Sequence, residues 1–344
     1  MRMLHLIVAL LAVTLAGCTA REDVVVLRLA HVLATDHPVH LGMARFGERL
    51  EELSSGTMRV EIYPNGQLGS ERETIELLQL GTLDLAKVSA AVVENFVPEM
   101  GVFSLPYLFD DADHLWRVLN GPIGKEILLA GEPYRIRGLC YYDAGFRSFY
   151  VRDRAVETPE DLQGLKIRVM RSNLSIRTIN LLGGNATPLA YGEIYTALQQ
   201  GVVDGAENNP PNFYGSKHYE VSRYYILDEH SAPPDVLLIS TWRWNQLSEQ
   251  QRAWIEEAIE ESVAYQRALW EEATAAALAA VEAAGITVIQ PDKTPFRQAV
   301  APLYEDLKGT ELGRWAERIR ALATAPAGQA AAHDTLSTNG SDSR

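Results

Sequence analysis

The sequence predicts an α/β fold built as two lobes, and three observations support that prediction. From residue 24 onward, short β-branched runs alternate with segments of helical spacing, which is typical of sheets covered by helices. The 344 residues allow one large domain or two domains of moderate size. Between Ser248 and Gly285 there is neither Gly nor Pro, which predicts one helix of about 36 residues and about 54 Å. Because that length exceeds the width of one domain, we expect the helix to lie across two lobes. A coiled coil is the alternative, although the apolar positions drift to Ala after Ala273.

The first part of the chain alternates regularly between the two kinds of element. Val60 and Ile62 fall on one face of an alternating run, as in a strand with one buried face. Ser70 and Glu73 form a capping-box pattern that predicts the start of a helix, and Gly81 follows its last apolar position. We therefore expect strands at 24–30, 58–63 and 83–89, and helices at 38–54 and 70–81.

The middle of the chain continues the same alternation. Thr158 followed by Pro159 predicts a capped helix start, and Gly201 ends a second helical segment. We expect strands at 139–142, 148–151, 166–170 and 202–206, and helices at 158–162, 175–182 and 191–200. From about Thr324 the composition turns to Ala, Gly, Ser, Asn and Asp, so residues 324–344 are expected to form a disordered tail.

The charge of the chain excludes several kinds of partner. The formal net charge is −14, from 45 acidic and 31 basic residues. Nucleic acids and anionic membrane surfaces both require clustered Lys and Arg, so the charge argues against both, and we expect no nucleic-acid partner. An acidic protein that binds an anion must concentrate its positive charge in one place, and a few arginines should therefore serve a local purpose.

The N-terminal residues predict export. Arg2 precedes the apolar run from Leu4 to Leu15, which is too short to span a membrane and is typical of a secretory signal. The run ends in Leu15-Ala16-Gly17-Cys18, which resembles the bacterial lipobox, in which the Cys is acylated and becomes the first mature residue. We therefore expect residues 1–17 to be a lipoprotein signal peptide and Cys18 to be the lipid anchor. An ordinary signal peptide with an incidental Cys is the alternative.

The sequence carries no recognisable catalytic motif. It lacks a Gly-x-Ser-x-Gly elbow, a P-loop, a Gly-x-Gly-x-x-Gly run after a strand and a His-Glu-x-x-His helix. Abundant Glu on helices is most simply a solvated face, so we expect a protein that is not an enzyme and that needs no cofactor. Cys140 lies in an apolar run and is expected to be a buried, inert thiol. His31, His37 and His40 could hold a metal, but no further ligand pattern completes a site, and pocket-lining histidines are the preferred interpretation.

Two features could carry binding chemistry. Arg168 lies mid-strand between Ile167 and Val169, which point to the core, so its guanidinium must be paired. A buried salt bridge and a bidentate clamp on a ligand carboxylate explain it equally well. The stretch from Asp204 to Pro211 (DGAENNPP) offers amide donors and acceptors after a strand, although Asn and Pro also favour a simple turn.

The segments around Arg168 and Asn208 resemble those of the solute-binding proteins of TRAP transporters, of the dicarboxylate-binding type. The stretch from Thr187 to Asn208 (TPLAYGEIYTALQQGVVDGAEN) is similar to the signature segment of that family, and Gly164–Val169 is similar to its arginine-bearing strand. The similarity covers nearly all of residues 24–320 and includes three further segments, Leu68–Glu73, Leu80–Asp84 and Val102–Phe109. It implies a two-lobed periplasmic-binding-protein fold with a ligand cleft between the lobes.

The resemblance also implies roles for individual residues. The carboxylate-clamping arginine of the family falls on Arg168, and a second ligand-facing arginine falls on Arg147. The amide that completes the clamp falls on Asn208, and the aromatic residue that packs on the ligand falls on Tyr191. Polar contacts from the remainder of the cleft are expected from Glu71, Asn209 and His37.

The resemblance narrows the cargo and the partners. Residues 206–211, 218–221 and 229–231 are similar to the branch associated with sugar acids, including uronates, but Pro233-Pro234-Asp235 replaces a more usual Val-Pro-Glu. We therefore expect a small organic acid as ligand and the TRAP permease subunits as partners. The protein should lie on the periplasmic side of a bacterial membrane and touch that membrane only through its lipid anchor. Dicarboxylates or hydroxy acids, and ligand sensing for a membrane receptor, are the alternatives.

The expected layout of the chain follows from these inferences. A tether at 18–23 follows the signal peptide. Lobe I comprises 24–145 and about 233–272, and lobe II comprises 146–232 and about 273–323.

Overall fold

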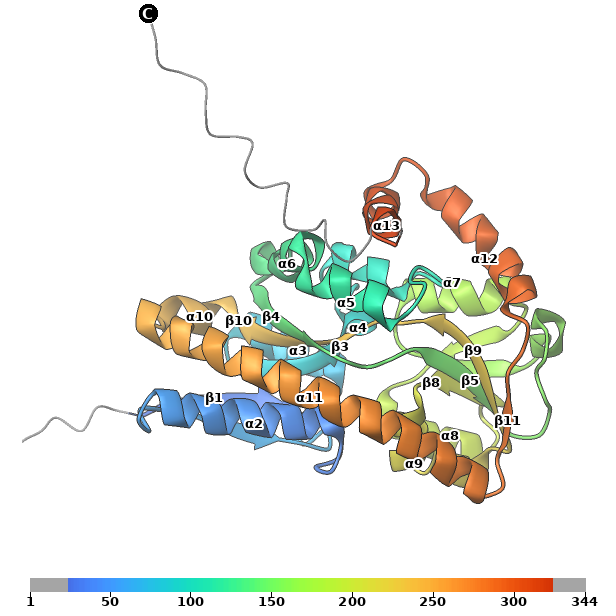
Figure 1. Ribbon diagram of the computed structural model, residues 1–344, viewed down its shortest axis with the longest axis horizontal. Helices are drawn as coiled ribbons and strands as arrows, with labels where there is room; N and C mark the ends of the chain where they lie inside the picture. Colours follow the sequence, from blue (N-terminus) through green and yellow to red (C-terminus); the bar gives the residue numbers. More distant parts are fainter. Residues whose placement is uncertain (1–23, 324–344) are drawn as a thin grey trace, which may run out of the picture.

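The computed structural model describes residues 24–323, and it has two lobes side by side that are joined by one long helix (Figure 1). The predicted signal peptide, tether, lipid-anchor Cys18 and C-terminal tail lie outside the described residues. Within the described range, no helix is both long and apolar enough to cross a membrane.

The first lobe is built on a five-stranded sheet with the order β2-β1-β3-β10-β4. β1, β2 and β3 are parallel, and β10 pairs antiparallel with both β3 and β4. The strands are β1 (Val25–Ala30), β2 (Met58–Tyr63), β3 (Leu85–Ser89), β4 (Ile136–Tyr142) and β10 (Asp235–Ser240). β10 therefore comes from a part of the chain that has already crossed into the second lobe and returned.

The second lobe is built on a six-stranded sheet with the order β11-β9-β5-β8-β6-β7. Its strands are β5 (Arg147–Val151), β6 (Lys166–Val169), β7 (Asn185–Pro188), β8 (Gly205–Asn208), β9 (Tyr224–Ser231) and β11 (Thr287–Ile289). β6 is parallel to β7 and β8, whereas β5 is antiparallel to β8 and β9. The carboxyl ends of β6 and β8 thus lie at one edge of this sheet.

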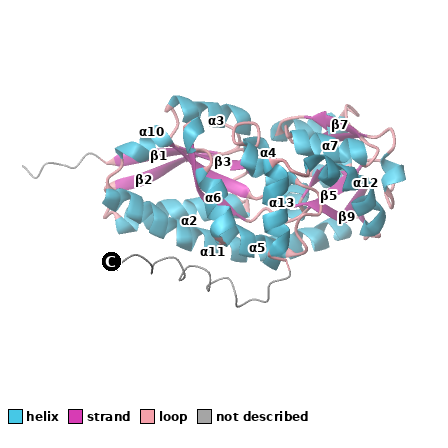
Figure 2. Ribbon diagram, turned by 90° about the horizontal axis from the view of Figure 1, so that it is seen from above, coloured by secondary structure: helices cyan, strands magenta, loops and turns pink. Residues whose placement is uncertain are grey.

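Helices cover both faces of each sheet (Figures 1 and 2). The α-helices are α2 (Pro38–Leu53), α3 (Glu71–Leu80), α4 (Ala90–Val93), α5 (Ala112–Asn120), α6 (Pro122–Leu129), α7 (Asn173–Leu181), α8 (Ile194–Gln199), α9 (Pro210–Gly215), α10 (Thr241–Gln246), α11 (Glu249–Ala283), α12 (Lys293–Leu307) and α13 (Glu311–Ala321). Short 3-10 turns are η1 (Pro98–Ser104), η2 (Glu132–Tyr134), η3 (Pro159–Leu162), η4 (Tyr191–Glu193) and η5 (His218–Val221).

The alternation of side chains along each strand separates the core into layers. In β10, Leu237 and Ile239 pack with α2 and α11, whereas Val236 and Leu238 pack on the opposite face. In β5, Phe149 and Tyr150 likewise belong to opposite layers. Because both faces are covered, both strands are buried along their whole length, including the polar residues with which β5 (RSFYV) and β10 (DVLLIS) begin.

The long helix confirms the main expectation about architecture. α11 is a single helix of 35 residues that begins at the Ser248 capping box. It packs along α2 in the first lobe and reaches α9 in the second, so it is not a coiled coil. The chain crosses between the sheets after β4, where Gly145 has φ of 57° and a Cβ there would lie 3.0 Å from the Trp270 indole nitrogen.

Some elements differ from the expectations. The strand expected at 202–206 is found at Gly205–Asn208, because the main chain joins the ladder only where Gly205 approaches the Tyr150 carbonyl. The sequence analysis did not predict several elements, which are strands β7, β9, β10 and β11 and helices α4, α5, α6, α9, α10, α12 and α13. The lobe boundaries stay a prediction, although Trp315 and Ile319 of α13 pack in the core beside the first sheet rather than in the second lobe.

Candidate ligand cleft

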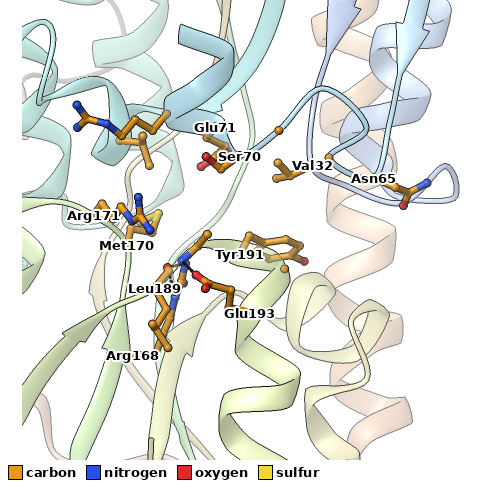
Figure 3. Close-up of a pocket in the computed structure, with 16 residues that line it drawn as sticks. Val32, Asn65, Ser70, Glu71, Arg168, Met170, Arg171, Leu189, Tyr191 and Glu193 are labelled. Atoms are coloured by element: carbon orange, nitrogen blue, oxygen red, sulfur yellow. Dashed lines mark hydrogen bonds between the residues drawn. The ribbon is translucent and has the colours of Figure 1, made fainter. Parts of the chain in front are cut away.

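A cleft lies between the lobes at the carboxyl ends of their parallel strands, which is where ligands bind in open α/β sheets. Its outer part has a volume of about 290 Å³, and a narrow inner part adds about 30 Å³. Glu71, Arg168, Met170 and Tyr191 line both parts. In Figure 3, Glu71 approaches from the first lobe, and Arg168, Met170 and Tyr191 lie opposite it on the second.

Arg168 sits at the wall of this cleft without a carboxylate partner. Its side chain is 3% exposed, and its Nε and one Nη donate to the main-chain carbonyl of Leu189 at 3.0 and 2.8 Å (Figure 3). Among residues 24–323, no carboxylate lies within ion-pair distance of it. Burial, together with the charge of Arg147, lowers the pKa of Arg168 below its usual value, although Glu207 partly opposes the shift. The internal salt bridge that the sequence left open is therefore absent.

Arg147 is instead the member of a buried ion pair. It donates to the carboxylate and the main-chain carbonyl of Glu207, and to Oδ1 of Asn208 at 2.8 Å. Burial opposes the charge on Arg147, but Glu207 outweighs burial and raises its pKa. His230 lies 3.8 Å from the same carboxylate and 2.8 Å from Asp228. Arg147 also lines the inner cleft, but Glu207, its ion-pair partner, neutralises most of its charge.

The His230 pairing predicts a pH dependence of stability. Burial alone would lower the pKa of His230, but Asp228 and Glu207 raise it to about 9. A raised histidine pKa stabilises the folded state below the unfolded value of about 6.5, and that contribution is lost as the pH rises toward 9. The melting temperature of the wild-type protein should therefore fall by roughly a few degrees between pH 6.5 and 9, and His230→Gln should not show this fall. Calorimetry of both proteins across this range measures the difference, and identical pH profiles would contradict the assignment.

Three asparagines at the end of β8 and just after it form a connected network. Oδ1 of Asn208 accepts from Arg147, from the main-chain N–H of Asn209 and from Nδ2 of Asn212. The amide nitrogen of Asn208 is therefore the end that can meet a ligand. Both ends of the Asn209 amide are used, by the first turn of α9 and by the carbonyl of Ala144. Asn209 thus positions the loop, and it also lines the inner cleft. Asn212 lines the cleft as well, and it was missed because nothing in the sequence distinguishes it from an ordinary helix residue.

Tyr191 and His37 meet at Asn212 from opposite lobes. The Tyr191 hydroxyl donates to Oδ1 of Asn212 at 3.0 Å, so its ring is held against the cleft. His37 caps α2 through Nδ1, and its Nε2 donates to the same oxygen at 3.1 Å. Burial lowers the pKa of His37 to about 3, which keeps the ring neutral. His37 therefore bridges the lobes and does not line the cavity.

A charged group in the first lobe was also missed. Lys87 of β3 is buried and lies 3.5 Å from Glu71 and 3.1 Å from Asp235. Burial alone would lower the pKa of Lys87, but the two carboxylates raise it. The sequence did contain a signal for this group, because Lys87 lies inside the buried strand Leu85–Ser89 just as Arg168 lies inside β6. Pro233 and Asp235, the segment that departs from the sugar-acid branch, line the inner cleft.

The site has the features of a binding site. Among the described residues, no group of three or more His, Cys, Asp or Glu side chains could hold a metal. His31 and His40 bond to each other at 2.9 Å, and burial lowers the pKa of His31 to about 2. Two lobes, a polar cleft between them and an unpaired buried cation in its wall are typical of a two-lobed solute-binding protein.

The family follows from comparison with known proteins. A family model described as bacterial extracellular solute-binding protein, family 7, matches residues 29–310, and the chain belongs to this family, DctP. This confirms the resemblance, the two-lobed fold and the expectation of an extracytoplasmic solute-binding protein of the TRAP type rather than an enzyme.

Relatives and solved structures agree with that membership. The C4-dicarboxylate-binding periplasmic protein DctP of Rhodobacter capsulatus is 32% identical over 332 residues, which is 95% of this chain and 98% of the relative. A TRAP solute-binding protein from a Bradyrhizobium species, in complex with D-galacturonate, has a TM-score of 0.84 at 43% identity, over 86% of this chain and 99% of that chain. One from Chromohalobacter salexigens, with bound D-glucuronate, has a TM-score of 0.84 at 36% identity, over 86% and 99% of the two chains.

Proposed function

We propose that this protein captures a uronate, a sugar acid with one carboxylate, in the cleft and delivers it to a TRAP permease. The observation that carries the proposal is Arg168, a buried guanidinium with no carboxylate partner among residues 24–323. An uncompensated buried charge is costly, so the site is built for an anion that arrives from outside. Guanidinium groups bind carboxylates in a bidentate manner, and the Leu189 carbonyl already fixes the orientation of this one.

The first-lobe wall favours one carboxylate over two. Lys87 lies between Glu71 and Asp235, so this group carries a formal net charge of −1, from one cation and two anions. A second ligand carboxylate placed here would be repelled, whereas sugar hydroxyls can donate to the two carboxylates and accept from the ammonium. The galacturonate and glucuronate complexes of similar proteins support this choice over a C4-dicarboxylate.

The same proposal includes the location of the protein. The Leu15–Cys18 motif supports acylation of Cys18 after removal of residues 1–17, with the protein held on the periplasmic side of a bacterial membrane. Its partners would then be the small acid and the permease, with no nucleic acid involved.

A thermal-shift screen tests the cargo. D-galacturonate and D-glucuronate are expected to raise the melting temperature, because a ligand at one hundred times its dissociation constant stabilises the fold by about 2.7 kcal/mol. Galactose and glucose serve as matched ligands without the carboxylate and should give no shift. Succinate, malate and sialic acid test the other cargo classes. A shift by a C4-dicarboxylate without any shift by a uronate would overturn the uronate assignment but leave the carboxylate clamp in place.

A further inference from the structure

Three large apolar side chains gather at one end of the first lobe. Leu80 at the end of α3 is 72% exposed, Trp242 of α10 is 54% exposed and Tyr134 of η2 is 42% exposed. Trp242 lies against Gly81, where a Cβ would be 3.3 Å from its ring, and Gln79 donates to the Tyr134 carbonyl at 2.9 Å. Leu80, Tyr134 and Trp242 therefore lie close to one another, and they are named here the pole patch. Exposed apolar side chains that cluster in this way usually mark an interaction surface.

The pole patch lies at the end of the first sheet that is opposite the cleft, where β1 and β3 start and β10 ends. β10 ends beside the start of β3, since Ile239 pairs with Leu85, and α10 follows directly. β1 starts at this same end, because its Leu29 pairs with Leu85 and Val25 lies four residues earlier. Asp84 joins the two segments by accepting from Arg28 of β1 and Arg243 of α10. Figures 1 and 2 both place α10 and the beginning of β1 at one end of the molecule.

The length of chain ahead of β1 sets a limit on where this pole can be. Cys18 precedes Val25 by seven residues, which span at most about 25 Å when fully extended. If Cys18 carries the lipid, the start of β1 stays within that distance of the bilayer. The second lobe lies at the far end of α11, whose 35 residues are about 53 Å long. The pole patch is thus the surface that an anchored molecule presents near the lipid.

The charges around the pole patch suit a lipid surface, in contrast to the acidic chain as a whole. One arginine lies within α10, and three others lie close to it. Arg243 lies over the Trp242 ring at 5.5 Å, and Arg137 and Arg252 lie over the Trp244 ring at 4.8 and 5.4 Å. The Arg135 carbonyl accepts from the main-chain N–H of Thr241. Two carboxylates, those of Asp84 and Glu132, pair with members of this set. Arginine with exposed Trp and Tyr is the combination that favours the interface of an anionic bilayer.

We propose that the pole patch rests on the bilayer surface when the protein is anchored, with Trp242 in the headgroup region and the first lobe nearest the lipid. This inference rests on the anchoring of Cys18 proposed above, and it departs from the expectation that the lipid anchor is the sole contact with the membrane. It does not depend on the identity of the cargo. It gives the anchored protein a fixed orientation, in which the second lobe and the ligand cleft stand away from the membrane.

The experiment uses the full chain, produced in a bacterial host and reconstituted in vesicles of phosphatidylethanolamine and phosphatidylglycerol with a brominated phosphatidylcholine. Intact mass first establishes whether Cys18 carries lipid. Bromine quenches tryptophan fluorescence on contact, and Trp242 is the exposed one among six tryptophans, all of which lie within residues 24–323. The anchored protein should be quenched, and Trp242→Phe should remove most of that quenching. Leu80→Ser combined with Tyr134→Ser should also reduce it.

Tyr214→Ser combined with Tyr265→Ser provides the matched control, because these exposed side chains lie on α9 and α11, away from the pole patch. This control should leave the quenching unchanged. The proposal is overturned if anchored protein is not quenched, if Trp242→Phe changes nothing, or if Cys18 carries no lipid. It is also overturned if Cys18→Ala protein forms a dimer that Trp242→Ser abolishes, since the pole patch would then bind a second copy. Uronate-induced thermal shifts of every variant report the cargo assignment separately.

Discussion

Replacing Arg168 by Met is expected to weaken the binding of D-galacturonate or D-glucuronate by roughly 30-fold or more, because loss of one partner from a buried, hydrogen-bonded charge pair costs about 2–5 kcal/mol. The ligand carboxylate would lose its cation, while the apolar stem of the side chain would still fill its place in β6. Since Arg168 has no carboxylate partner within the described chain, the ligand-free protein should not lose stability. Titration calorimetry measures the affinity, and the melting temperature without ligand measures the stability.

Arg171→Met is the control for this change. Arg171 follows β6 three residues after Arg168 and lines the outer cleft, but it is exposed. Its loss should change affinity only several-fold, because an exposed charge is screened by solvent. Arg168→Lys separates charge from geometry, since an ammonium cannot make the bidentate contact. If Arg168→Met bound a uronate as tightly as the wild-type protein, the clamp assignment would be wrong.

Replacing Glu207 by Gln is expected to lower the free energy of unfolding by about 3–5 kcal/mol, which corresponds to a fall in melting temperature on the order of 10 °C. Gln has nearly the same shape, but it leaves Arg147 and protonated His230 buried without their shared carboxylate. Although burial disfavours the charge on Glu207, Arg147 and His230 lower its pKa to about 2. Its contribution is therefore present above pH 4.5 and is lost as the pH falls toward 2. Calorimetry near pH 6 measures the fall.

A surface ion pair and a double variant provide the comparisons. Arg177 and Asp306 lie 2.7 Å apart with both side chains exposed, so Asp306→Asn should cost no more than about 1 kcal/mol. Removing both members of the buried pair, as Arg147→Met with Glu207→Gln, should recover part of the lost stability because neither charge is left alone. Equal effects of Glu207→Gln and Asp306→Asn would show that the buried pair has no special role.

Local pattern was sufficient to predict most of the elements around the cleft. The capping box at Ser70, the alternation around Arg168 and the Gly-free stretch after Ser248 each identified an element that the structure contains. The strand near residue 205 was misplaced because its buried residues, from Gly205 to Asn208, are mostly polar and lack the usual apolar signal. β10 was missed because its partners β3 and β4 lie about 100 residues or more earlier in the chain, where no local pattern indicates the pairing.

The candidate site was predictable in part. Six of the seven predicted residues line the inner cleft, and their individual roles in binding remain predictions. They are Arg168, Arg147, Asn208, Asn209, Tyr191 and Glu71. Asn209 and His37 are used in capping helices and joining segments, which a sequence cannot reveal because the bonded partners come from other elements. Lys87 was not recognised as part of the site, since Asp235 lies 148 residues away from it.

The sequence by itself determined the alternating elements, the long helix, the family and the choice of a mid-strand arginine as the centre of the site. It could not decide whether Arg168 meets a carboxylate of the protein or one from a ligand. That choice depends on Glu207, which β5 and β8 bring to Arg147 instead, across 60 residues of sequence. The spacing of apolar residues in the sequence indicates only which face of an element a side chain occupies. Ion pairing depends on the distances between elements, which that spacing does not give. Only the packed tertiary structure therefore shows that the buried Arg168 has no carboxylate partner within residues 24–323, which is the basis of the proposal that it binds the ligand.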